Sequence, residues 1–148
     1  MCLMLYIGTA RELPLASSPA LTVERVADSR RAVGQWFSNP HVRFVGAHTG
    51  CSCGFPAVTA DVPIEYFDEM RLDSDDRVAD LASVRALIDL IGAAGSPSDR
   101  IELYPVADGE EAATPRGVID WHFDSLDPER LFFNERFMHV VHKHQGPV

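Results

Sequence analysis

The sequence predicts an α+β fold, in which a mostly antiparallel sheet carries one long amphipathic helix, at about residues 74–94, and a shorter helix packed on it. Two observations support this prediction. Short segments in which apolar and polar residues alternate recur along the chain, and this is the pattern of half-buried strands. Only one long segment repeats its apolar residues at helical spacing, so strands and helices do not alternate as they do in a parallel α/β sheet.

The first half of the chain supplies three predicted strands, one loop and the short helix. The strands are rich in apolar residues and cover 2–8, 21–26 and 41–48. The prolines within 11–20 predict a loop. Asp28 suits the N-terminal cap of the short helix, and the Asn-Pro pair at 39–40 would end it.

The long helix is the clearest prediction from the pattern. Asp73 or Ser74 can cap its N-terminus, and Gly95 with Pro97 would stop it. The preceding segment, 61–80, is rich in acidic residues, which indicates a solvated face in preference to a patch for a cationic partner. One stripe of apolar residues should face the sheet: Val78, Leu81, Val84, Leu87, Ile88 and Ile91.

The second half of the chain predicts three more strands. The first covers 101–106 and is followed by a polar loop at 107–117. The second, 118–126, alternates cleanly and should place Asp120, His122 and Asp124 on one face. The apolar segment 131–143 predicts a strand in its second half, with a helix as the alternative.

Size and composition indicate one globular domain over 1–148. Of the 148 residues, 46% are hydrophobic and 24% are charged. The 13 basic and 22 acidic residues give a net charge of −9, so we expect neither nucleic acid nor a membrane surface as a partner. A homo-oligomer, a small-molecule partner and a protein partner stay open. The apolar start is too short for a signal peptide, which predicts a cytoplasmic protein.

Two of the three cysteines lie in a loop directly after the strand at 41–48. Gly50 and Gly54 flank Cys51 and Cys53, and glycine permits a positive φ or a close approach to another group. Sulfurs two residues apart can both reach one metal ion, and such thiols tend to be reactive or metal-bound unless they are buried. An odd number of cysteines in a reducing compartment argues against a disulfide framework.

These cysteines and the one at the start of the first strand form the candidate site. Cys2, Cys51 and Cys53 are the candidate catalytic thiols, and with His48 they are the candidate metal ligands. Three thiolates and one imidazole suit tetrahedral zinc, and sulfur also suits Cu(I). The site requires the first strand to lie beside the strand that precedes the loop. Alternative sources of the imidazole are His41 and His122.

Cys2 also suggests a second kind of chemistry. When the initiator methionine is removed, the α-amino group of Cys2 can act as the base for its own thiol. This start is similar to that of N-terminal-nucleophile amidohydrolases, which also open with Met-Cys and a hydrophobic strand. The alternative is that Cys2 is a small apolar residue at the edge of a strand.

The histidines of the second half supply a third candidate site. Asp120 or Asp124 could orient His122 for acid–base or metal chemistry. Alternating polar residues on a half-exposed strand explain the same pattern without any site. We predict that the later histidines lie at the surface, with the last two as a further metal candidate; they are His139, His142 and His144.

Two stretches of the sequence carry a resemblance to a family. M-C-L-M-L-Y-I-G-T at 1–9 and N-P-H-V-R-F-V-G-A-H-T-G-C-S-C-G-F at 39–55 resemble a family of small uncharacterised bacterial proteins, in which a similar strand ends in a G-C-x-C-G-F loop. The resemblance implies a cytoplasmic bacterial domain and brings no activity with it.

Three functional interpretations stay open after the sequence. The favoured one is a cysteine-centred site for thiol chemistry or for a soft metal such as zinc or copper. The second is a non-enzymatic interaction or scaffold domain whose cysteines are buried. The third is an N-terminal-cysteine hydrolase, and the sequence does not decide whether the protein is an enzyme.

Overall fold

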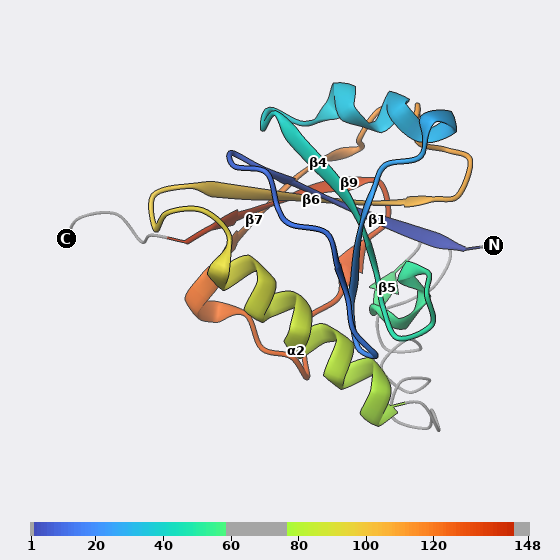
Figure 1. Cartoon of the computed structure of the whole chain (residues 1–148). Helices are drawn as coiled ribbons and strands as arrows, with labels where there is room; N and C mark the ends of the chain where they lie inside the picture. The colour runs from blue at the N-terminus through green and yellow to red at the C-terminus, as the bar shows by residue number, and fades with distance from the viewer. Residues whose placement is uncertain (1, 59–76, 144–148) are drawn as a thin grey trace.

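A seven-stranded sheet forms the centre of the protein in a computed structural model, which describes residues 2–58 and 77–143 (Figure 1). The strands lie side by side in the order β2-β3-β4-β1-β6-β9-β7. Neighbouring strands are antiparallel except for β7 and β9, which are parallel, so the predicted α+β fold with a mostly antiparallel sheet is confirmed. The strands of this sheet are β1 (Leu3–Thr9), β2 (Ala16–Ser17), β3 (Thr22–Arg25), β4 (His41–Gly46), β6 (Arg100–Ala107), β7 (Gly117–His122) and β9 (Phe137–His142).

Helical segments cover both faces of this sheet. The helix α2 (Arg77–Ala93) crosses one face, and the 3-10 helix η1 (Asp28–Trp36) lies on the other (Figure 1). The alternation within β1 separates two cores, because successive side chains of a strand point to opposite faces. Leu5 and Ile7 pack in the core beneath α2, whereas Met4 and Tyr6 pack in the core beneath η1.

The helix α2 buries most of the predicted apolar stripe. Its buried apolar residues are Leu81, Val84, Leu87 and Ile91. Val78 is 81% exposed, so its place in the stripe was wrong. At 3.6 residues per turn Val78 lies about 120° around the helix from Val84, which points it away from the sheet. The predicted start at Asp73 or Ser74, and most of the acidic segment, lie outside the described residues.

Lys143 and Gly95 stabilise the end of α2. Gly95 has a φ of +64°, which favours glycine after a helix. The Lys143 ammonium donates hydrogen bonds to the carbonyl oxygens of Gly92, at 2.9 Å, and of Ala94, at 2.5 Å. A cation at this end of a helix also suits the helix dipole. The helix therefore ends where the sequence predicted, and its last carbonyl groups are bonded by Lys143, which directly follows β9.

The short helix forms differently from the prediction. It is a 3-10 helix capped by Ala27, and Asp28 makes no side-chain capping bond, so the predicted cap was wrong. Side chains three residues apart lie above one another in a 3-10 helix. This spacing places both Val33, which is fully buried, and Trp36 against the sheet.

The segment that follows β7 leaves the sheet earlier than predicted. β7 ends at His122, and the next three residues form the 3-10 turn η3 (Phe123–Ser125), so Asp124 does not share a strand face with Asp120. A short parallel pair, β5 (Ala57–Val58) with β8 (Phe133–Asn134), then leads into β9, which confirms a strand in the second half of 131–143. None of the helices within the described residues has the length and apolar character needed to cross a membrane.

The core beneath η1 contains the buried carboxylate of Glu111, and each of its two oxygens accepts a hydrogen bond. The Tyr6 hydroxyl donates to Glu111 Oε2 at 2.9 Å, and the Gly109 backbone N–H donates to Oε1 at 2.9 Å. Trp36 of η1 donates its indole N–H to the Glu111 carbonyl at 3.1 Å. Burial, and then the hydrogen bond to Glu111, raise the pKa of Tyr6. Glu111 therefore joins the sheet, η1 and the 107–117 loop.

Candidate metal centre

The pairing of β1 with β4 brings the three cysteines to one end of the sheet. The two strands are antiparallel, with Leu5 opposite Val45, so the start of β1 lies beside the end of β4. Cys2 directly precedes β1, and Cys51 and Cys53 follow β4 in a short loop. The strand pairing that the candidate site required is therefore present.

The three cysteines form one compact group. Their Sγ atoms all lie within 4.8 Å of one another. Cys2 and Cys53 are exposed, Cys51 is partly buried, and none is in a disulfide. Within 2–58 and 77–143 no other group of three or more potential metal ligands lies this close together. The sulfurs are thus near enough to bind one metal ion.

The two glycines around the cysteines serve different purposes. Gly50 has a φ of +82°, which side chains other than glycine rarely adopt. At Gly54 an added Cβ would lie 2.8 Å from the Cβ of Ala47, so this position needs glycine for space. The loop also closes on itself, because the Ala47 N–H donates to the Cys51 carbonyl at 2.8 Å. Both uses of glycine that the sequence suggested occur here.

Ser52, between the two loop cysteines, anchors the loop to the sheet. It is fully buried in the 3-10 turn η2 (Ser52–Gly54). Its hydroxyl accepts the Leu5 backbone N–H at 2.7 Å and donates to the Val45 carbonyl at 2.6 Å. Leu5 and Val45 are opposite each other in the ladder, so the hydroxyl bridges their two backbone groups. Cys51 and Cys53 therefore flank a residue that two hydrogen bonds hold to the sheet.

Replacing Ser52 by alanine should destabilise the protein by about 2 kcal/mol, because a buried N–H and a buried carbonyl would lose their partner. Urea unfolding of Ser52→Ala measures this. The control is Ser98→Ala, at an exposed serine that contacts only another serine hydroxyl in the described residues, where we expect a change below about 0.5 kcal/mol. Equal stability of the two variants would contradict the bridging role.

His48 is bound to α2 and does not join the sulfurs. Its Nε2 lies 2.7 Å from Asp80 Oδ1, and its backbone N–H donates to Ser83 Oγ at 3.0 Å. Ser83 is fully buried and donates in turn to the Ala20 carbonyl at 2.7 Å. The sulfur group contains no imidazole from the described residues. His48 thus holds the cysteine loop against the helix.

The alternative imidazoles lie elsewhere in the sheet. His41 is opposite Thr9, at the far end of β1 from Cys2, which is about 20 Å away at 3.3 Å per residue. His122 is on β7, at the edge of the sheet and separated from β1 by β6 and β9. The three cysteines are therefore the predicted ligands that the structure brings together.

The thiols differ in acidity within the group. Burial raises the pKa of the Cys51 thiol, but hydrogen bonds from Thr49, from the Cys53 backbone and from the thiols of Cys53 and Cys2 outweigh it, so the pKa of Cys51 is lowered. The Thr49 hydroxyl lies 3.4 Å from the Cys51 sulfur. Burial and the hydrogen bond to Cys51 raise the pKa of Cys53. Cys51 is thus more acidic than its loop neighbour Cys53.

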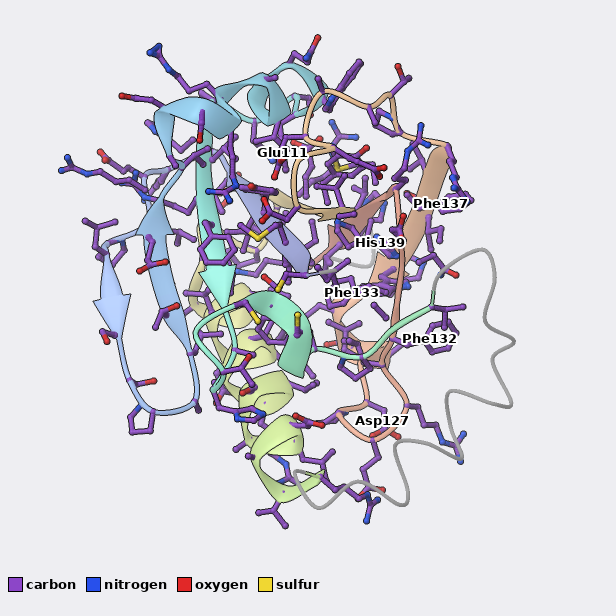
Figure 2. All side chains as sticks on the ribbon, turned by 90° about the vertical axis from the view of Figure 1, so that its right-hand side faces the viewer. Glu111, Asp127, Phe132, Phe133, Phe137 and His139 are labelled. Atoms are coloured by element: carbon purple, nitrogen blue, oxygen red, sulfur yellow. The ribbon has the colours of Figure 1, made fainter. Side chains whose placement is uncertain are left out.

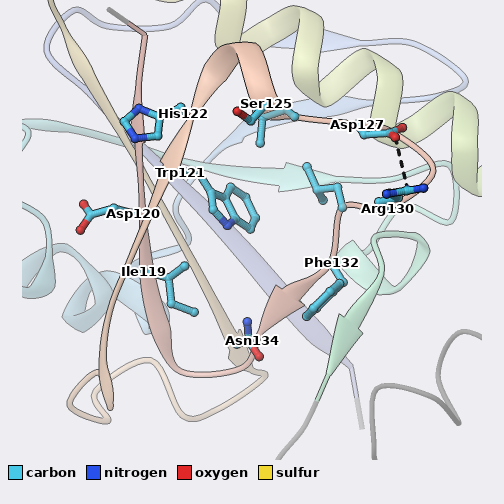
Figure 3. Close-up of a pocket in the computed structure, with 11 residues that line it drawn as sticks. Ile119, Asp120, Trp121, His122, Ser125, Asp127, Arg130, Phe132 and Asn134 are labelled. Atoms are coloured by element: carbon cyan, nitrogen blue, oxygen red, sulfur yellow. Dashed lines mark ion pairs between the residues drawn. The ribbon is translucent and has the colours of Figure 1, made fainter. Parts of the chain in front are cut away.

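The predicted Asp120–His122 site lies at a separate pocket of about 480 Å³ (Figure 3). Trp121 and Phe132 contribute aromatic walls, and Asp120 and His122 lie on the β7 side. The Asp120 carboxylate pairs with His142 and not with His122, because His142 Nε2 lies 2.8 Å from Asp120 Oδ1. The geometry therefore pairs Asp120 with a histidine of the neighbouring strand.

His139 corrects the prediction that the late histidines are at the surface. It is fully buried, next to Phe133 (Figure 2), with ring centroids 4.7 Å from Trp121 and 5.3 Å from Phe133. Its Nε2 accepts the Asn134 backbone N–H at 3.1 Å. The signal that could have revealed it is the flanking Met138 and Val140, which mark an interior strand buried on both faces. His142 is partly exposed, and His144 lies outside the described residues.

Comparison with known proteins adds no further identification. No family model, no curated protein and no solved structure matches the chain.

Proposed function

We propose that the protein binds a thiophilic metal ion, zinc or Cu(I), through Cys2, Cys51 and Cys53. The observation that carries this proposal is the convergence of three Sγ atoms within 4.8 Å from two distant parts of the chain. Three sulfurs around one ion at a metal–sulfur distance of about 2.3 Å are separated by roughly 4 Å. The spacing of the free thiols therefore needs only small side-chain rotations to accommodate an ion.

The protonation of the cluster suits a metal site. Metal ions bind thiolates, so binding must release the protons of the thiols. The pKa of Cys51 is lowered, and its interactions with Thr49 and with the two neighbouring cysteines contribute to this shift. A thiol that loses its proton more readily is a better metal ligand. Metal affinity should consequently fall as the pH is lowered.

The rival interpretations have less support. An interaction domain with buried structural cysteines does not fit Cys2 and Cys53, because both side chains are exposed. An N-terminal-cysteine hydrolase would use the Cys2 thiol alone, and it would not account for the two further sulfurs that lie within 4.8 Å of it. Thiol chemistry without a metal stays compatible with the acidity of Cys51.

The test is the metal content of tag-free protein purified under reducing conditions and loaded separately with zinc and with Cu(I). Elemental analysis should find close to one ion per chain. Replacing Cys51 and Cys53 by serine should reduce the bound metal to background, because one sulfur alone cannot hold an ion against a chelator.

The matched control is a variant with His122→Ala and His142→Ala, which removes two histidines that the sequence offered as alternative ligands and should retain the metal. Absence of metal from the wild-type protein after loading with either ion would overturn the proposal and leave reactive thiols. Retention by the serine variant together with loss in the histidine variant would move the site to β7 and β9.

A further inference from the structure

We infer that the ion is Cu(I), held in a three-coordinate environment by the sulfurs of Cys2, Cys51 and Cys53 alone. This inference rests on the proposed function and assigns the metal and its coordination number. It follows from the number of donors at the cluster, from the contacts of the nearest histidine and from the exposure of the sulfurs.

The donor count at the cluster is three. The group of potential ligands consists of three sulfurs, and no carboxylate or imidazole from residues 2–58 and 77–143 extends it to four. Thr49 has an oxygen near the group, but its hydroxyl is a hydrogen-bond partner of Cys51 at 3.4 Å. A metal at the centre of the sulfurs would thus find three strong protein donors.

Two contacts hold His48, which precedes the cysteine loop, against α2. His48 Nε2 lies 2.7 Å from Asp80 Oδ1, and the backbone of the same residue is bonded to Ser83 Oγ at 3.0 Å. The ring also packs against Gly54, whose added Cβ would be 3.0 Å from His48 Cδ2. Moving Nε2 to the sulfurs would break its contact with Asp80. His48 therefore supports the loop, and no residue of 2–58 or 77–143 supplies the fourth donor of a tetrahedral site.

Three sulfur donors distinguish the two candidate metals. Structural zinc sites in proteins close a tetrahedron with four protein ligands, so zinc here would need water or an added ligand. Cu(I) is softer than zinc and favours thiolate sulfur, and three such donors complete its coordination. The cluster therefore matches Cu(I) better than zinc.

The position of the sulfurs also suits an exchangeable ion. Cys2 and Cys53 are exposed, and only Cys51 is partly buried. A thiolate of an incoming carrier can reach the ion from solvent and replace the protein sulfurs one at a time, without any change in oxidation state. The site would accordingly take Cu(I) from low-molecular-weight thiolate complexes and return it to them.

The experiment is a competition on the full chain, kept reduced and free of oxygen. Cu(I) is supplied in a bicinchoninate buffer, and zinc is supplied at equal total concentration. We expect one Cu(I) per chain with zinc left in solution, and X-ray absorption at the copper edge should show three sulfur neighbours without nitrogen or oxygen. Cys51→Ser should weaken Cu(I) binding by at least about 100-fold.

His48→Ala decides the coordination number. We expect its Cu(I) affinity to stay within threefold of the wild-type value, with circular dichroism used to confirm that the variant is folded. A nitrogen neighbour that disappears in His48→Ala, or zinc retained in place of copper, would overturn this inference while the proposed metal site stands. Failure to bind either metal would overturn both.

Discussion

Lowering the pH from 7 to 4 should remove about 3 kcal/mol from the free energy of unfolding through one side chain, His139. Burial lowers the pKa of His139 from its usual value to about 4. Between about pH 6.5 and pH 4 the unfolded chain binds a proton at this residue and the folded protein does not. Stability from this group is therefore complete above pH 6.5 and is lost as the pH falls toward 4.

The surroundings of His139 explain why the neutral ring is preferred. The side chain is fully buried on β9, the strand between β6 and β7, and it packs against the rings of Trp121 and Phe133. Its Nε2 accepts the Asn134 backbone N–H, so a proton on that nitrogen would place two donors against each other. A charged ring would also be removed from water, which is costly, and no carboxylate of residues 2–58 or 77–143 is bonded to it.

Urea unfolding at several pH values between 7.5 and 4.5 measures this effect. His139→Leu removes the titrating group and should be less sensitive to pH than the wild-type protein over this window. His142→Gln is the matched control, because it removes a partly exposed histidine of the same strand. Its free energy of unfolding should depend on pH as that of the wild-type protein does. If the unfolding free energy of His139→Leu depended on pH as strongly as that of the wild-type protein, other groups would be the cause of the acid sensitivity.

Phe133→Ala should destabilise the protein by about 3–5 kcal/mol, the range for removing a buried aromatic ring. Phe133 is fully buried, and its ring centroid lies 5.3 Å from His139, 5.4 Å from Trp121 and 6.5 Å from Phe55. These neighbours come from the cysteine loop, β7 and β9. Loss of the ring would leave a cavity where those segments meet.

The adjacent Phe132 provides the control for Phe133. It lines the pocket, is partly exposed, and lies farther from the centre of the molecule than Phe133 (Figure 2). Phe132→Ala should cost less than about 1 kcal/mol. Thermal unfolding of both variants gives the comparison, and equal losses of stability would contradict the assignment of Phe133 as the buried member of the pair.

Phe132 and Phe133 show which parts of the fold can be predicted from the local sequence pattern. Apolar composition identified β1, β4 and β9, and helical spacing identified α2, because each signal lies within one element. Which of Phe132 and Phe133 points inward depends on the pairing of β8 with β5, whose residues are more than 70 positions earlier in the chain. Such long-range pairing leaves no mark in the local pattern.

The candidate site also has a part that the local sequence predicts and a part that depends on pairing between distant strands. The sequence located Cys51 and Cys53 between two glycines, since the loop is local. The approach of Cys2 depended on the antiparallel pairing of β1 with β4, which was stated as a condition and is met. The prediction that His139 lies at the surface was wrong because β9 is an interior strand, between β6 and β7. The sequence around the late histidines does not show which strands pair with β9.

The hydroxyl of Ser52 has a thermodynamic consequence for any ion bound by the cysteines. Because it bridges the Leu5 N–H and the Val45 carbonyl, the loop cannot leave the sheet without opening the end of the central ladder. Ligand binding and folding are then linked by mass action, so an ion bound only by the folded protein would strengthen the whole sheet. The metal would hold together two strands that are nearly 40 residues apart in the chain, and its loss would first weaken the end of the β1–β4 ladder that lies beside the cysteines.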